Sequence, residues 1–227
     1  MEKMIFVNQK MYLNSLKEVD LFQKDLASYK NDIVVFPSTL YLQNYIDKGY
    51  TVGSQNISDE IKGPHTAEVS ASALKDLKVE YVLIGHHEVR EKYKEENVQI
   101  ISKIEKALEN NLKVVLCVGE TIEEKKNNQT YEVIKKQLNH IKPNENIIIS
   151  YEPVWSIGTN KIPENFEIYN IVKYIKTLGH HKVLYGGSVS DLNIEKLNKI
   201  DNLDGFLIGG CAQKTEAVKK IIEVVLK

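Results

Sequence analysis

A single carboxylate, Glu152, stands where an apolar run gives way to a loop. Residues 147–149 are consecutive isoleucines, a run typical of a strand buried on both faces. Pro153 follows the carboxylate, and because proline fixes φ and has no backbone N–H, it ends the strand there. A carboxylate so placed suits a general base, although a strand-end side chain held by backbone amides would have the same pattern.

The segment after this carboxylate has the composition of a lid. Val154, Trp155 and Ile157 are bulky and apolar, whereas Gly158 and Thr159 are small. This composition is unusual for a solvated loop, and it predicts a flap that closes over a site and excludes water. A well-packed turn beside the strand is the alternative that the stretch leaves open.

Two basic side chains also follow apolar runs. Lys10 follows the first run, where its ammonium could neutralise a ligand anion or a developing oxyanion. His86 follows the fourth run and is suited to donating a proton to a carbonyl oxygen. A metal at His86 and His87 is not predicted, because no carboxylate or further histidine stands at convincing ligand spacing. Taken singly, such a lysine or histidine is as often an ordinary polar residue.

Two pairs of adjacent glycines follow the last two apolar runs. Gly186 and Gly187 precede Ser188, and Gly209 and Gly210 form the second pair. Adjacent glycines let backbone N–H groups approach an anion closely, and a following helix N-terminus adds a favourable dipole. The two pairs predict a phosphate site, with two tight turns as the alternative.

Eight apolar runs position these residues, and helix-period segments separate them. The runs cover residues 4–7, 33–36, 50–52, 81–84, 114–118, 147–149, 183–185 and 206–208. Runs without polar alternation indicate a parallel sheet buried on both faces, and eight strand-then-helix units predict an α/β fold, a single eight-stranded parallel (β/α)8 barrel. In such a barrel the site lies at the C-terminal ends of the strands. No linker divides the chain, so a single domain over residues 1–227 is expected.

Helix ends and faces can be predicted for several of these segments. Ser15 is expected to cap the first helix, and Gly179 to end the sixth. The expected buried faces of the fourth and last helices are Val98, Ile101, Ile104 and Leu108, and Val218, Ile221, Ile222 and Val225.

Composition excludes several classes of partner. A net charge of −1 argues against a nucleic-acid footprint, which requires a basic stripe. No apolar run approaches the ~20 residues that span a bilayer, so no membrane partner is expected. Cys117 and Cys211 stand far apart in apolar or glycine-rich contexts and are predicted to be reduced, which points to a cytoplasmic protein.

Together these parts specify a reaction. A carboxylate base under a lid, a histidine proton donor, a lysine and a phosphate cradle suit abstraction of a proton α to a carbonyl in a sugar phosphate. The lid then has a chemical purpose, because an enediolate phosphate exposed to water readily eliminates its phosphate.

Five motifs, in matching order from Asn8 to the last helix, resemble the triosephosphate isomerase family. The most specific resembles that family's catalytic-base and lid signature: Tyr151-Glu152-Pro153-Val154-Trp155 with Ile157-Gly158-Thr159. The others are Ile84-Gly85-His86, Leu116-Cys117-Val118-Gly119-Glu120-Thr121, Tyr185-Gly186-Gly187-Ser188-Val189 and Gly205-Phe206-Leu207-Ile208-Gly209-Gly210. The resemblance implies an isomerase of glycolysis and gluconeogenesis, which interconverts dihydroxyacetone phosphate and glyceraldehyde 3-phosphate without a cofactor.

The resemblance also implies residue roles. Glu152 would be the base, His86 a neutral electrophile, and Lys10 a catalytic group that contacts the substrate together with Asn8. The backbone of four residues would hold the phosphate: Gly158, Ser188, Gly209 and Gly210. Tyr185 and Ser188 would latch the closed lid, and Glu88 would lie near Lys10.

The long polar loop over residues 56–69, with Thr66 and Glu68, resembles the family loop that inserts into a neighbouring subunit, which implies a homodimer. The chain is shorter than most members of the family and departs from its pattern at Gln9, Tyr12, Ala67, His87, Val89 and Asn160. None of these departures removes a reacting group. They bear instead on substrate preference, lid kinetics and the dimer contact.

Three alternatives remain at this stage. An isomerase of a four-carbon ketose phosphate, such as an erythrulose phosphate, would use the same mechanism. A Schiff-base aldolase or lyase would use Lys10 as a nucleophile. A non-catalytic sugar-phosphate-binding paralogue would have little reason to keep Glu152, His86 and Lys10 together.

Overall fold

Eight parallel strands form a closed barrel in the computed structural model, which describes residues 3–159 and 161–227. The strands are β1 (Met4–Asn8), β2 (Val34–Phe36), β3 (Thr51–Ser54), β4 (Tyr81–Ile84), β5 (Lys113–Val118), β6 (Ile147–Tyr151), β7 (Val183–Tyr185) and β8 (Gly205–Ile208). Each strand pairs with the next along the chain, and β8 pairs with β1 in a register that places Met4 opposite Gly205. The predicted (β/α)8 barrel is confirmed.

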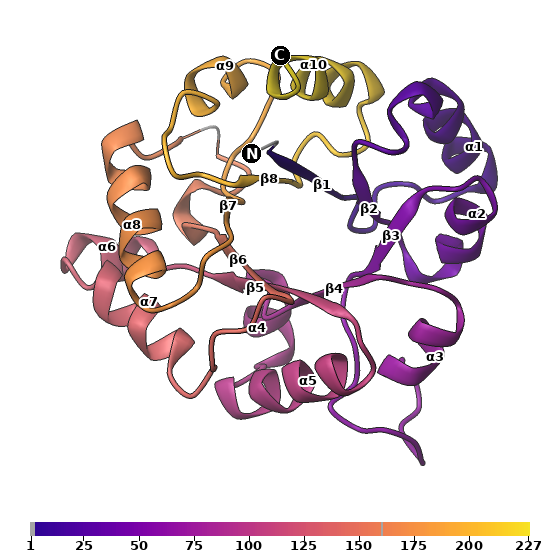
Figure 1. The fold of residues 1–227 in the computed structure, drawn as a ribbon, viewed down its shortest axis with the longest axis horizontal. Helices are drawn as coiled ribbons and strands as arrows, with labels where there is room; N and C mark the ends of the chain where they lie inside the picture. The colour runs from indigo at the N-terminus through magenta and orange to yellow at the C-terminus, as the bar shows by residue number, and fades with distance from the viewer. Residues whose placement is uncertain (1–2, 160) are drawn as a thin grey trace.

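Helices surround the strands, as Figure 1 shows, and α10 lies between α9 and α1 in this outer ring. The α-helices are α1 (Leu16–Asp25), α2 (Leu42–Asp47), α3 (Ala71–Asp76), α4 (His87–Tyr93), α5 (Asn97–Glu109), α6 (Ile122–Lys126), α7 (Thr130–Leu138), α8 (Asn165–Thr177), α9 (Ile194–Leu197) and α10 (Thr215–Val225). Short 3₁₀ turns are η1 (Ala27–Tyr29), η2 (Thr39–Tyr41) and η3 (Val154–Ser156).

Two helix ends and one helix face follow the sequence closely. The Glu18 N–H donates to Ser15 Oγ (3.3 Å), which caps α1 as predicted. Gly179, with φ of 95°, follows the end of α8 in the left-handed conformation that glycine adopts readily. The predicted face of α10 is buried at every position: Val218, Ile221, Ile222 and Val225.

The predicted face of α5 is partly wrong. Val98 is 75% exposed, whereas Ile100, Ile104 and Ala107 are buried. The apolar residues of this helix form two overlapping stripes, and the stripe that packs inward also brings Lys103 to a buried carboxylate. The ion pair between Lys103 and Glu95 therefore lies on the buried face that the structure shows, rather than on the predicted face.

Alternate side chains on each strand fill two separate cores, because successive residues of a strand point to opposite faces. The set inside the barrel is Phe6, Val34, Phe36, Leu83, Val115, Cys117, Ile148, Leu184 and Leu207. A larger set packs between the strands and the helices. The interior is thus filled by side chains, and the strand ends above it are left to build a site.

Further sequence expectations concern cysteines, membranes and the long loop. Cys117 and Cys211 are buried and unbridged, as predicted. Within residues 3–159 and 161–227, no helix combines the length and apolar composition needed to cross a bilayer. The connection between β3 and α3 projects beyond the ring of helices in Figure 1, and within it Ala67 adopts a φ of 74°.

Candidate active site

A cavity of about 430 Å³ opens at the C-terminal ends of the strands. All eight predicted site residues line it: Asn8, Lys10, His86, Glu152, Gly158, Ser188, Gly209 and Gly210. The polar groups come from β1, β4 and β6, and the glycine-rich loops follow β7 and β8. The barrel therefore gathers into one cavity residues that are more than two hundred positions apart in the sequence.

Glu152 directly follows β6 in a nearly sealed position, with 2% of its surface exposed. Its backbone N–H donates to the Val118 carbonyl (2.7 Å). Two glycines make room for it: a Cβ at Gly119 would lie 1.9 Å from the Glu152 carbonyl oxygen, and one at Gly186 would lie 2.8 Å from Glu152 Cγ. Ser150 Oγ donates to Oε1 (3.3 Å), whereas Oε2 has no hydrogen-bond partner among residues 3–159 and 161–227.

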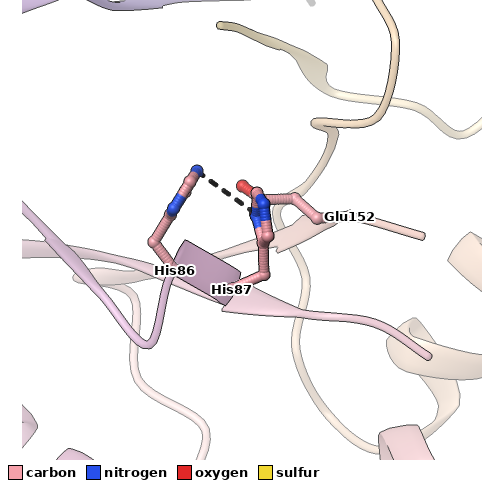
Figure 2. Close-up of side chains that lie close together, drawn as sticks. All are labelled: His86, His87 and Glu152. Atoms are coloured by element: carbon pink, nitrogen blue, oxygen red, sulfur yellow. Dashed lines mark ion pairs between the residues drawn. The ribbon is translucent and has the colours of Figure 1, made fainter. Parts of the chain in front are cut away.

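Two imidazole rings face this carboxylate, as Figure 2 shows. His86 caps α4, and its Nδ1 accepts the Glu88 backbone N–H (3.3 Å). A neutral His86 that accepts at Nδ1 carries its proton on Nε2, which lies 3.8 Å from Glu152 Oε2. His87, one of the departures from the family pattern, places its Nδ1 3.9 Å from the same oxygen.

Burial and charge set the protonation states of this group. Burial opposes ionisation of Glu152, but His86 and His87 outweigh it and hold the pKa of that carboxyl below its usual value. Burial lowers the pKa of His86, and the nearby Glu152 only partly compensates. Near neutral pH the site thus holds an ionised carboxylate beside a neutral imidazole, the states required of a base and a hydrogen-bond donor.

Lys10 adopts a left-handed backbone conformation, with φ of 50°, that is uncommon for a residue with a side chain. Its N–H donates to Asn8 Oδ1 (3.0 Å), and its carbonyl accepts Gln55 Nε2 (2.8 Å). Its Nζ pairs with Glu88 Oε1 at 2.5 Å, so the expected proximity of Glu88 and Lys10 is confirmed. A strained backbone held by several contacts is a common feature of functional sites.

The predicted lid packs around a buried carboxylate. Trp155 Nε1 donates to Glu120 Oε1 (2.8 Å), and the Tyr151 hydroxyl donates to both Glu120 oxygens (3.2 Å each). Beyond this anchor, Ile157 and Gly158 turn toward the cavity and line it. Asn160, the departure expected in the lid hinge, lies outside the described residues.

The hydroxyl of Ser156 joins the lid to the loop after β7. Ser156 Oγ donates to the Lys161 carbonyl (2.5 Å), lies 3.3 Å from the Tyr185 hydroxyl and accepts the Ser188 backbone N–H (3.2 Å). Ser156 is fully buried. Tyr185 and Ser188 therefore both contact the lid, and each does so through the Ser156 hydroxyl.

The glycine-rich loops differ from expectation in one respect. A Cβ at Gly210 would meet no atom within 4 Å, so its backbone faces open space in the cavity. No helix directly follows Ser188, since α9 begins only at Ile194. The helix dipole expected behind this loop is therefore absent there, and the backbone N–H groups of the loops remain as donors for an anion.

The two departures near β1 lie in different environments. Gln9 is buried and donates through Nε2 to the Tyr45 hydroxyl (2.6 Å), away from the cavity. Tyr12 lines the cavity and is 44% exposed. Of these two residues, only Tyr12 is placed to contact a substrate.

Sequence reasoning missed three residues that position the site. Gln55 directly follows β3, a strand end for which no site residue was predicted. Its Nε2 donates to the Phe36 carbonyl (3.0 Å) as well as to the Lys10 carbonyl. Gln137 on α7 binds both the N–H (2.8 Å) and the carbonyl (3.0 Å) of Gly119. Ser156 could have been noticed as a polar residue among apolar lid residues; Gln137 carries no comparable signal.

A possible ligand set for a metal was also missed. His86, His87 and Glu152 each offer one donor atom, and the three atoms lie within 4.8 Å of one another. The third donor, Glu152, is distant from the two histidines in the sequence; it directly follows β6, which the barrel brings to their side.

A parallel barrel with an ionised carboxylate, a neutral imidazole and an ammonium around one cavity defines an enzyme of the acid–base class. Comparison with known proteins defines the family, since the chain matches the triosephosphate isomerase family over residues 3–225. The chain belongs to the triosephosphate isomerase family and is thus an isomerase.

Individual relatives agree with this assignment. The chain is 40% identical to the triosephosphate isomerase of Wolbachia pipientis wMel, over 85% of this chain and 77% of that protein. It is 35% identical to the triosephosphate isomerase of Buchnera aphidicola subsp. Cinara cedri (strain Cc), over 99% of both chains. Identity to the triosephosphate isomerase of Malacoplasma penetrans (strain HF-2) is 34%, again over 99% of both.

Proposed function

We propose that this chain, as a single isomerase domain, interconverts dihydroxyacetone phosphate and D-glyceraldehyde 3-phosphate without a cofactor. The observation that carries the proposal is the buried, ionised Glu152 facing the Nε2–H of a neutral His86 across one cavity. Family membership supports the choice of a triose phosphate as the substrate.

The chemistry follows from these protonation states. Glu152 takes a proton from the carbon next to the carbonyl, while the His86 Nε2–H donates a hydrogen bond to the carbonyl oxygen. The ammonium of Lys10 stabilises the negative charge that develops on that oxygen. The hydroxyl proton on the oxygen of the first carbon then passes to the former carbonyl oxygen, with His86 as the relay. Glu152 returns its proton to the former carbonyl carbon, which completes the isomerisation and regenerates the carboxylate.

Phosphate binding positions the substrate for these steps. The backbones of Gly158, Ser188, Gly209 and Gly210 line the cavity and would donate N–H groups to the phosphate. Gly158 belongs to the lid, so phosphate binding and lid closure are coupled. Closure excludes water and protects the enediolate from losing phosphate.

We further propose a cytoplasmic homodimer assembled through the 56–69 loop. A second hollow of about 560 Å³ lies beside that loop, and Asn8, Lys10 and His86 line both this hollow and the catalytic cavity. Exposed apolar side chains, with Met11 at 80% and Ile61 at 57%, suit burial against a second copy. Sedimentation of the purified protein tests the assembly, and a monomer across the working concentration range would contradict it.

The function is tested by proton NMR of dihydroxyacetone phosphate with the enzyme in deuterated buffer. Deuterium incorporation at the reacting carbon, together with aldehyde product, is expected. Glu152→Gln should lower kcat by ~10⁴-fold, the upper end for a positioned base, and leave phosphate binding largely intact. Glu132→Gln, an exposed carboxylate on α7, is the matched control and should be neutral. Near-normal turnover of Glu152→Gln would refute the assignment of the base.

One observation keeps a four-carbon ketose phosphate as the second candidate. Tyr12 lines the cavity where the family pattern has a different residue, so the space beyond a three-carbon substrate differs here. Comparing kcat/KM for dihydroxyacetone phosphate and erythrulose phosphate separates the two. Exchange with neither, from folded protein, would favour a binding paralogue, and a borohydride-trapped adduct at Lys10 would favour a Schiff-base enzyme.

A further inference from the structure

Three side chains of the site present donor atoms to one point. His86 Nε2 lies 3.8 Å, and His87 Nδ1 3.9 Å, from Glu152 Oε2. The donor atoms of the three residues lie within 4.8 Å of one another, and Figure 2 shows the carboxylate directed at both rings. The isomerisation uses Glu152 and His86 but leaves His87 without a part.

Two of these atoms lack any partner. Glu152 Oε2 and His87 Nδ1 are buried and make no hydrogen bond within the described part of the chain. A buried polar atom without a partner destabilises the protein, so a ligand that satisfied both atoms would be bound favourably. Direct hydrogen bonding between them is excluded by their separation of 3.9 Å.

The chemistry of the set fits a zinc-type ion. Two imidazoles and one carboxylate form a known set of three protein ligands for Zn²⁺, with water in the fourth position. Zn–N and Zn–O bonds of about 2.0–2.2 Å place tetrahedral donors roughly 3.3–3.5 Å apart. The two separations from Glu152 Oε2 therefore need to shrink by only about half an ångström, and the widest separation in the set, at most 4.8 Å, by roughly 1.3–1.5 Å. Both His86 and Glu152 face the cavity, which leaves room for the fourth ligand.

A second carboxylate supports ligation by His86. Binding through Nε2 requires the neutral ring to carry its proton on Nδ1, which would then give up the Glu88 backbone N–H that it accepts in this structure. Glu88 Oε2 lies 3.8 Å from Nδ1 and would have to move closer to accept the new N–H. Metal-bound histidines almost always donate the other N–H to a carboxylate, a carbonyl or water. The tautomer shift moves one proton between the two ring nitrogens and releases none to solvent.

We propose that His86, His87 and Glu152 form an inhibitory site for a zinc-type divalent ion. The bound ion occupies the lone pairs of Glu152 Oε2 and His86 Nε2, the two atoms that the isomerisation needs. Inhibition is therefore competitive with substrate. His87 provides the third ligand, so the site depends on this departure from the family pattern. The inhibition rests on the proposed function, whereas ion binding does not.

The test uses the whole enzyme, stripped with a chelator and titrated with Zn²⁺. Calorimetry should show one ion per chain, and Co²⁺ in its place should give the intense visible absorption of tetrahedral coordination by nitrogen and oxygen. His87→Ser, which removes one ligand, should weaken Zn²⁺ binding by at least ~100-fold, more than the loss of a second-shell partner costs. Zinc inhibition should weaken in parallel, measured relative to the variant's own basal rate.

Matched controls make each outcome decisive. His181→Ser, at an exposed histidine before β7, should bind and respond to zinc like the unmodified enzyme. Mg²⁺ prefers oxygen ligands and should not inhibit. Equal zinc affinity in His87→Ser and the unmodified enzyme would overturn the proposal. If His87→Ser fails to fold, an octahedral Co²⁺ spectrum from the unmodified enzyme would overturn it instead.

Discussion

His87 Nδ1 lies 3.9 Å from Glu152 Oε2, and both atoms are buried without a hydrogen-bond partner in the described part of the chain. The imidazole is thus close enough to act on the carboxylate through its charge and polarity, but it does not hold the carboxylate in place. That relationship gives the site a pH dependence that can be altered without touching the reacting groups.

His87→Ser should move the acid limb of kcat/KM to higher pH. His87 is one of the groups that hold the pKa of Glu152 below its usual value, so its removal raises that pKa. Because the base must be ionised, activity is then lost earlier as the pH falls. Both pH profiles are measured with a chelator present, so that no metal ion occupies the site. Ionisation of the substrate phosphate affects both profiles equally, so a difference between them reports on the enzyme. Superimposed acid limbs would show that His87 does not influence the base.

Trp155 is the only tryptophan in the chain, so its fluorescence reports on the lid alone. Its indole N–H binds Glu120, and the Lys125 ammonium lies 4.1 Å from its ring centroid. Saturating inorganic phosphate should change the emission of Trp155, because an anion bound at Gly158 contacts the same lid segment and alters the surroundings of the indole. The change should follow the binding curve measured by calorimetry, and constant emission at saturation would mean that the lid does not respond to phosphate.

Ser156→Ala should weaken the binding of phosphate ligands and increase the loss of inorganic phosphate from the enediolate. The Ser156 hydroxyl binds Lys161, Tyr185 and Ser188, and each hydrogen bond contributes about 1 kcal/mol. A loss of this order raises KM by roughly five- to tenfold.

A looser lid also lets water reach the enediolate, so inorganic phosphate released per turnover should increase in Ser156→Ala. Tyr185→Phe removes one partner of the same hydroxyl and serves as the second arm of a double-mutant cycle. Non-additive effects are expected because the two side chains interact. Strict additivity would show that the Ser156–Tyr185 contact contributes nothing.

Ala67→Gly should stabilise the protein by about 1 kcal/mol, since Ala67 adopts a φ of 74° that costs a residue with a Cβ roughly that much. Thermal denaturation measures the gain. Ala73→Gly, in the middle of α3, makes the same chemical change and should destabilise by a similar amount, because glycine is a poor helix former. A loss of stability in both variants would mean that Ala67 is not strained.

The sequence predicted the strands and the end of the barrel that carries the site, for physical reasons. Each strand is buried on both faces, so it appears as an apolar run that nothing interrupts. Because all strands are parallel, their C-terminal ends meet in one place, and residues such as Lys10 and Glu152 were expected together.

What the sequence did not predict depends on three-dimensional neighbours. The two stripes of α5 are similarly apolar, so Val98 and Ile100 could not be ranked before the packing was known. Gln9 was named as a departure that bears on substrate preference, yet it directly follows β1 and its side chain donates to the buried Tyr45 hydroxyl, away from the cavity. His87 and Glu152 are distant in sequence, and their proximity is a property of the closed barrel.

The glycines that flank the base have a consequence for mutational tolerance. Gly119 and Gly186 take no part in the chemistry, yet any side chain at either position would collide with Glu152. In a survey of random substitutions, these two positions should be as intolerant as the base itself. Inactivating substitutions would therefore be found at the residues that surround the carboxylate as well as at Glu152, because the site requires the space around the carboxylate as strictly as its charge.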